Sequence, residues 1–252
     1  MTSVAQAIKG VLPRLVVFFK TLTIYFVVFI PQDQPSVLST ILKCLPVIGL
    51  IVFVILQTKS AGTESQFSKY ITTGLLFGCI GDALLVWHDF FDLGVVSFLI
   101  GHLLYIRAFT FQPLNLVVGV VCLLISVLGS LFFWSGLHGV LIVGAPIYSA
   151  IIMVMVWRAI SRVEFSENKW TWSKLVTCLG AISFAISDFF VGLNRFHGPF
   201  AYDQLIIMTT YYAAQFGIAI SILDAKLEPI KNDSSCTSDM KSVPINSHEK
   251  AY

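Results

Sequence analysis

The apolar residues of this chain fall into eight long runs, and a short polar stretch separates each run from the next. The runs lie at roughly 14–30, 37–57, 70–87, 93–111, 114–134, 138–158, 172–193 and 204–224. A helix of about 20 apolar residues spans the hydrocarbon core of a bilayer, so each run is long enough to cross it. The pattern predicts an all-α fold, a polytopic membrane bundle of eight transmembrane helices in residues 1–224.

The C-terminal segment, residues 225–252, has a different pattern. It is rich in Ser, Asn and Lys and contains no apolar run. A segment of this composition buries too little apolar surface to offset the entropy lost on ordering. We therefore expect a disordered tail after the last helix, and no second folded domain.

Composition and charge agree with a membrane protein. Hydrophobic residues make up 56% of the chain and charged residues 12%, about half the charged fraction of a soluble domain. With eight crossings, all lysines and arginines except Lys43 and Arg195 fall on the same side of the membrane as the N-terminus. Because positive loops stay in the cytosol, we expect both termini to be cytosolic. The sequence indicates no nucleic-acid partner, and it does not define an oligomeric state.

Two aspartates interrupt the apolar runs. Asp82 lies in the third run and Asp188 in the seventh. A charged carboxylate at the centre of a membrane helix costs about 2.5–3.5 kcal/mol on insertion scales. Gly74 and Gly78 share a helix face with Asp82, and glycines allow close approach of a neighbour. We expect Asp82 to point into the bundle as a catalytic acid or ion site, or as a structural hydrogen-bonding group.

The two aspartates also suggest a relation between the halves of the chain. The third and seventh runs would both cross outward from the cytosol. Asp82 and Asp188 would then lie in the distal half of the membrane, the half farther from the cytosol. Each is followed by a short polar turn and another run. This arrangement suggests a parallel 4+4 repeat about an axis along the membrane normal.

Four other polar residues pair on helix faces. His102 and Tyr105 are one turn apart in the fourth run, and Tyr211 and Gln215 are one turn apart in the eighth. The histidine is suited to shuttling a proton or donating to Asp82, or it is a satisfied core histidine. The Tyr–Gln pair is suited to holding a lipid headgroup or a water molecule, or to joining helices.

Polar residues around the end of the seventh run are further candidates. Ser187 is placed to hydrogen-bond a carboxylate. Arg195, beside Asn194, is one of the two basic residues on the distal side. A guanidinium suits phosphate recognition, but an interfacial anchor is the alternative reading.

Several common catalytic motifs do not occur in the sequence. There is no GxSxG nucleophile elbow, no HExxH, no P-loop, no Rossmann glycine set and no Cys/His cluster of zinc-site spacing. The sequence therefore predicts neither a serine nucleophile of that type nor a metal or another cofactor.

Four motifs, in this order and spacing, resemble the lysoplasmalogenases, which are eight-span membrane hydrolases, and most of all their animal endoplasmic-reticulum members. The motifs are GDALL at 81–85, GHLLY at 101–105, SDFFVGLNRF at 187–196 and YYAAQ at 211–215. The resemblance extends over residues 10–225.

The resemblance implies an enzyme of the endoplasmic reticulum membrane that hydrolyses the vinyl ether bond of lysoplasmalogens. Its products would be a fatty aldehyde and glycerophosphocholine or glycerophosphoethanolamine. Asp82 and Asp188 match positions of the family's active site, and the lysophospholipid headgroup is expected near Arg195, Asn194 or Tyr211.

Vinyl ether hydrolysis fits a pair of carboxylic groups. One aspartate would protonate the alkene, while the other stays ionised, stabilises the resulting cation and activates water, as in glycosidases. A proton-coupled transporter or lipid-binding protein is the competing interpretation, because buried acids and a parallel repeat suit transport as well. An inactive relative acting as a membrane scaffold is a third.

Overall fold

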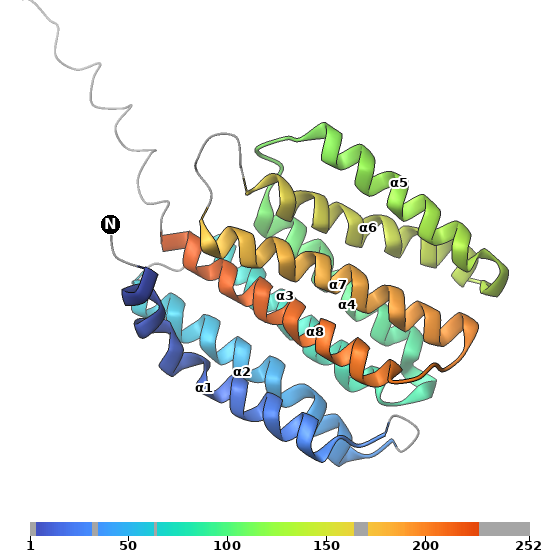
Figure 1. Ribbon diagram of the computed structural model, residues 1–252, viewed down its shortest axis with the longest axis horizontal. Coiled ribbons are helices and arrows are strands. Elements are labelled where there is room, and N and C mark those ends of the chain that lie inside the picture. Colours follow the sequence, from blue (N-terminus) through green and yellow to red (C-terminus); the bar gives the residue numbers. More distant parts are fainter. Residues whose placement is uncertain (1–3, 32–34, 63–64, 164–170, 227–252) are drawn as a thin grey trace, which may run out of the picture.

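The computed structural model describes residues 4–31, 35–62, 65–163 and 171–226, and within these ranges it is entirely helical, with no strand. Its long helices, shown in Figure 1, are α1 (Val4–Val28), α2 (Val37–Ala61), α3 (Gln66–Leu85), α4 (Phe91–Phe109), α5 (Leu116–Phe133), α6 (Leu141–Ser161), α7 (Trp172–His197) and α8 (Asp203–Ile220). Short 3₁₀ turns follow three of them: η1 (His88–Phe90), η2 (Trp134–Gly136) and η4 (Ser221–Lys226). The predicted bundle of eight helices is confirmed.

Local sequence signals set several helix starts. The side chains of Ser36, Ser65, Asn115 and Thr171 each accept a hydrogen bond from a backbone N–H in the first turn of α2, α3, α5 and α7. Such caps satisfy N–H groups that have no partner within the helix. Gly62 ends α2 in the left-handed conformation, at φ 71°, which glycine adopts without steric cost.

The helices run side by side, and successive helices pack against one another within α1–α4 and within α5–α8. The two sets meet where α4 contacts α6 and where α8 contacts α2 and α3. Figure 1 shows α5 at one edge of the bundle and α1 and α2 at the opposite edge. The 4+4 repeat stays a prediction, and each of the two sets contains one of the helices that carry the aspartates, α3 and α7.

Seven of the described helices are long and apolar enough to cross a membrane, judged by length and composition, and α3 is the one that falls short. The reason is the polar first half of α3, which contains Ser68, Lys69, Thr72 and Thr73 as well as glycines. Packing compensates, because α3 lies against α2, α4 and α8. Its crossing of the bilayer stays a prediction.

The bundle has polar groups inside and apolar groups outside. Val117 and Leu128 on α5 are 76% and 66% exposed, whereas Asp82, His102 and Gln215 are at most 1% exposed. In water this distribution would be unfavourable, but lipid tails solvate apolar side chains as well as a protein core does. The chain is thus built as a polytopic membrane protein.

The beginning of α1 and the end of η4 lie at the same end of the bundle (Figure 1). An even number of crossings is consistent with this placement, and the cytosolic location of that end stays a prediction. The turn η4 extends to Lys226, two residues into the predicted tail. Residues 227–252 lie outside the described part of the chain, so the predicted disorder is untested.

Candidate active site

The glycine face of α3 makes room for polar side chains from other helices. A Cβ atom at Gly74 would lie 2.3 Å from the ring of Tyr105, and one at Gly78 would lie 2.6 Å from the side-chain nitrogen of Gln215. No side chain is tolerated at such distances without movement of its neighbours. The predicted close packing of this face is confirmed, and its partners are side chains from α4 and α8.

We call the hydrogen-bonded group that results the Asp82 cluster: Asp82, Tyr211, Gln215 and Tyr105. The Tyr211 hydroxyl donates to Oδ2 of Asp82 at 2.5 Å, and Gln215 Nε2 donates to the Tyr211 oxygen at 2.9 Å. Tyr105 completes the chain by donating to Gln215 Oε1 at 3.1 Å. Asp82 is 1% exposed, so the cluster is sealed inside the bundle.

A second group, the Asp188 cluster, consists of Asp188, Tyr148 and His102 and joins α7, α6 and α4. The Tyr148 hydroxyl donates a short hydrogen bond to Oδ2 of Asp188. Nε2 of His102 lies 3.1 Å from the Tyr148 oxygen and 3.6 Å from the same carboxylate oxygen. The Asp188 side chain is 19% exposed, so this carboxylate is more accessible than that of Asp82.

The hydrogen-bond directions define the role of each ring nitrogen of His102. Because Tyr148 gives its proton to Asp188, Nε2 of His102 is the donor towards Tyr148. In the neutral ring, Nδ1 is then an acceptor. This atom is buried and has no hydrogen-bond partner within the described structure. His102 therefore has an unused acceptor in the interior of the bundle.

Aromatic rings join the two clusters, and the ring centroids of His102 and Tyr105 are 6.5 Å apart. The ring centroid of Phe184 lies 4.6 Å from that of His102 and 5.6 Å from that of Tyr211, so it contacts both clusters. Phe98 lies 6.2 Å from Phe184 and 5.8 Å from Tyr211, measured between ring centroids. The two clusters thus share Phe184 as a neighbour, through His102 on one side and Tyr211 on the other.

The structure groups most of the expected site residues, with two corrections. His102 belongs with Asp188 and Tyr148, so the expected donation from His102 to Asp82 is wrong. Ser187 does not bond a carboxylate either. Its hydroxyl donates to the backbone carbonyl of Ile207 at 3.1 Å and so ties α7 to α8.

Asn194 and Arg195 are not brought to either cluster. Asn194 donates a short hydrogen bond to the carboxylate of Asp203 at the start of α8. The Arg195 guanidinium is exposed and lies 4.7 Å from the ring centroid of Phe91. Both residues brace the distal end of α7, which favours the anchor reading of Arg195 over a role in headgroup binding.

Two residues near the aspartates were not singled out from the sequence. Tyr148 is a polar position in an apolar run, the same signal that indicated Tyr105. Lys43 is a basic residue in an apolar run, and only its bearing on topology was considered. In the structure Lys43 is 8% exposed, and its carbonyl accepts a hydrogen bond of 2.8 Å from Tyr212.

The fold and the site together define a class: polytopic helical membrane proteins whose interior contains two hydrogen-bonded carboxylic groups. Groups of this kind can donate or accept a proton away from bulk water. Tyrosine hydroxyls beside each carboxylate hold it in place.

Comparison with known proteins identifies the particular family. The model of the YhhN family matches residues 38–222, a range that includes both clusters. The chain belongs to this family.

Several curated relatives are similar over most of their length. Lysoplasmalogenase TMEM86A of Bos taurus is 36% identical over 234 residues, which are 92% of this chain and 97% of the relative. Lysoplasmalogenase TMEM86B of Sus scrofa is 36% identical over 84% of this chain and 88% of the relative. A lysoplasmalogenase homolog of Dictyostelium discoideum is 26% identical over 73% and 77%, respectively. The resemblance to lysoplasmalogenases is confirmed. No solved structure matches the chain.

Proposed function

We propose that this protein is a lysoplasmalogenase that hydrolyses the vinyl ether bond of 1-alkenyl-glycerophosphocholine and 1-alkenyl-glycerophosphoethanolamine. The observation that carries the proposal is the pair of hydrogen-bonded aspartate clusters that meet inside one membrane bundle, through His102, Tyr105 and Phe184. The curated relatives, which carry the name lysoplasmalogenase, support it.

The reaction begins with proton transfer to carbon. One aspartic acid gives its proton to the alkene carbon that is not bonded to oxygen, and the electrons of the double bond form the new C–H bond. An oxocarbenium ion results, with its positive charge shared by the other carbon and the ether oxygen. The second aspartate, still ionised, stabilises this cation by electrostatic attraction.

Water completes the reaction. It adds to the cationic carbon, and the second aspartate takes the proton that is released, which gives a hemiacetal. The hemiacetal hydroxyl then loses its proton as the bond from carbon to the glycerol oxygen breaks and that oxygen is protonated. The products are the aldehyde and the glycerophospho-base, and one water molecule is consumed.

The hydrogen bonds of the two clusters orient the reacting groups. Tyr211 and Tyr148 each hold one carboxylate oxygen and leave the other oxygen for substrate or water. Nε2 of His102 lies 3.6 Å from Oδ2 of Asp188, while Nδ1, which has no partner among the described residues, can accept a hydrogen bond from water or substrate. General acid–base groups placed in this way typically accelerate a reaction by about 10²–10⁴-fold.

The apolar exterior of the bundle suits a substrate that arrives from the bilayer. The alkenyl chain can stay among lipid tails and apolar helix faces while the polar part enters between helices. An endoplasmic reticulum location with cytosolic termini is part of the proposal, since the resemblance and the distribution of basic residues suggest it.

The test is aldehyde release by the purified protein from a 1-alkenyl lysophospholipid, with the matched 1-acyl lysophospholipid as the control substrate. We expect aldehyde from the vinyl ether lipid and no hydrolysis of the ester, and we expect Asp82→Asn to abolish the release. A well-folded protein that releases no aldehyde would contradict the proposal and direct attention to lipid binding or transport.

A further inference from the structure

A small pocket opens beside the Asp82 cluster, where the first two turns of α2, the end of α3 and the start of α8 meet. Its walls include Lys43, Tyr25, Gln204 and Leu85, and its volume is about 30 Å³. Leu85 is one helical turn beyond Asp82. The pocket therefore lies near Asp82, towards the distal end of the bundle.

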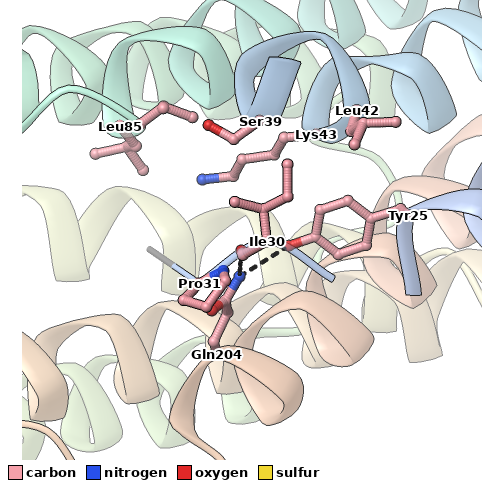
Figure 2. A pocket seen from close by; sticks show the side chains of 9 residues that line it. Tyr25, Ile30, Pro31, Ser39, Leu42, Lys43, Leu85 and Gln204 are labelled. Atoms are coloured by element: carbon pink, nitrogen blue, oxygen red, sulfur yellow. Dashed lines mark hydrogen bonds between the residues drawn. The ribbon is translucent and has the colours of Figure 1, made fainter. Parts of the chain in front are cut away.

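Lys43 brings a cation into this pocket. Its side chain is 92% buried by the bundle, and Figure 2 shows the nitrogen extending into the space beside Ile30 and Pro31. The ammonium group forms no hydrogen bond and no ion pair with any residue in the described parts of the chain. The three donors of the ammonium group have no partner among the described residues, so they are available to a ligand in the pocket.

Other groups in the pocket also suit an anion. Gln204 donates to the Ile30 carbonyl at 2.9 Å and, weakly, to the Tyr25 hydroxyl at 3.5 Å (Figure 2). The hydroxyl hydrogen of Tyr25 has no acceptor among the described residues, so it is free to point into the pocket. The first turns of α2, which place Lys43, also contribute the positive end of a 25-residue helix.

We propose that this pocket binds the phosphate of the lysophospholipid substrate, with Lys43 as its charged ligand and the Tyr25 hydroxyl as a second donor. The inference rests on the proposed function and goes beyond it by assigning the headgroup site. The headgroup was expected near Arg195, Asn194 or Tyr211. The structure places Asn194 and Arg195 away from both clusters, and Tyr211 donates to Asp82.

The position of the pocket suits the chemistry. In a lysoplasmalogen only the short glycerol backbone lies between the phosphate and the vinyl ether oxygen. A phosphate at Lys43 would therefore hold the reactive double bond near Asp82. The Lys43 and Asp82 side chains are near enough for electrostatic attraction, without a direct ion pair. Binding of the phosphate would give the ammonium a close anionic partner, which it does not have among the described residues.

The first experiment measures binding without catalysis. The probes are a saturated 1-alkyl glycerophosphocholine, which has no vinyl ether to cleave, and the matching 1-alkyl glycerol, which has no phosphate. We expect the phospholipid to bind wild-type protein more tightly in thermal-shift titrations. Lys43→Met should reduce its affinity about ten- to hundredfold and leave the 1-alkyl glycerol unaffected.

Two further variants guard against a trivial loss of folding. Lys43→Arg keeps the positive charge and should retain the preference for the phospholipid. Lys59→Met removes an exposed lysine at the other end of α2 and should bind as the wild type does. Equal binding of the phospholipid by Lys43→Met and the wild type would overturn the proposal.

Inorganic phosphate separates a lipid site from a site for the free ion. We expect inorganic phosphate alone to stabilise the protein less than the 1-alkyl glycerophosphocholine at the same concentration. Equal stabilisation by the free ion would overturn the assignment to a lipid headgroup.

The second experiment compares hydrolysis of 1-alkenyl glycerophosphocholine with hydrolysis of 1-alkenyl glycerol. Lys43→Met should lower kcat/KM for the phospholipid through KM and leave that for the 1-alkenyl glycerol unchanged. An equal loss for both substrates would mean that Lys43 acts on Asp82 instead, which contradicts the proposal. If the wild type hydrolyses neither, the proposed function fails, and the binding experiment still decides the phosphate site.

Discussion

The Asp82 cluster and the Asp188 cluster each contain an aspartate that accepts a hydrogen bond from a tyrosine, but their surroundings differ. Asp82 is 1% exposed and heads a chain of three hydrogen bonds that crosses three helices. Asp188 has a side chain that is 19% exposed, with a tyrosine and a histidine beside it. Two carboxylates in unequal surroundings can take unequal roles in one reaction, as the two carboxyl groups of glycosidases do.

The difference arises from the helices that carry them. On α3, glycines on the face of Asp82 admit the side chains of Tyr105 and Gln215, which pack closely against this helix. On α7, close glycine contacts lie two turns before Asp188, where Gly180 meets Gly217, and one turn after it, where Gly192 meets Phe133. The Asp188 side chain is 19% exposed, so water and substrate have easier access to it than to Asp82.

The largest expected effect comes from removing either acid. Asp82→Asn and Asp188→Asn should each lower the rate of aldehyde release by about 10²–10⁴-fold, because each removes one of the two acid–base groups. Rates are to be measured on purified protein whose thermal unfolding has been checked. Asp92→Asn, which changes an exposed acid at the start of α4, is the control and should keep its activity.

The next largest effect is expected from removing the tyrosine hydroxyls that donate hydrogen bonds to the two aspartates. Tyr211→Phe removes the one hydrogen bond that the described structure gives to Asp82, and it should lower kcat about ten- to hundredfold. Tyr148→Phe should cost less, because His102 remains near Asp188. Tyr212→Phe removes a hydrogen bond to a backbone carbonyl and serves as the control for stability. A larger loss of kcat for Tyr148→Phe than for Tyr211→Phe would contradict the expected order of the two variants.

A smaller effect should appear in stability. Gly74→Ala forces a methyl group against the Tyr105 ring and should lower the free energy of unfolding by about 1–3 kcal/mol. Gly129→Ala on α5 is the matched control, since nothing lies within 4 Å of its added Cβ. Thermal unfolding in detergent measures both. Equal stability of the two variants would mean that the glycine face is not needed for packing.

The smallest effect is expected at the distal end of α7. Arg195→Ala removes an exposed side chain that lies over Phe91 and touches neither cluster. Since surface substitutions change stability by about 0.5 kcal/mol or less, kcat/KM should stay within about twofold of the wild type. A tenfold rise in KM would return Arg195 to the headgroup site.

The long apolar runs were sufficient to predict the helices. A membrane helix must satisfy its backbone hydrogen bonds internally, so length and hydropathy alone define most of it. The exception is α3, whose first half is polar. Its contacts with α2, α4 and α8 compensate for this, and such contacts between helices cannot be predicted from a local sequence pattern. The hydrogen bonding of Asp82 and Asp188 was predictable because a carboxylate in an apolar run is costly unless it has a partner, and their catalytic role stays a prediction.

The pairing of side chains across helices was not predictable. Tyr148 and Lys43 are single polar positions in apolar runs, and their proximity to the aspartates depends on how α6 and α2 pack. His102 lies on α4, which contacts both α3 and α6, so the sequence alone did not decide between Asp82 and Asp188. Ser187 precedes Asp188 in the sequence but faces α8, because neighbouring residues on a helix point about 100° apart.

The most direct test of the account is a double-mutant cycle of aldehyde release with Asp82→Asn, Asp188→Asn and the combined variant. If the two clusters serve one reaction, each single substitution should be nearly as damaging as both together, because residues that act as a unit are not additive. If either single variant hydrolysed the vinyl ether at the wild-type rate, the shared role of the two aspartates would be contradicted.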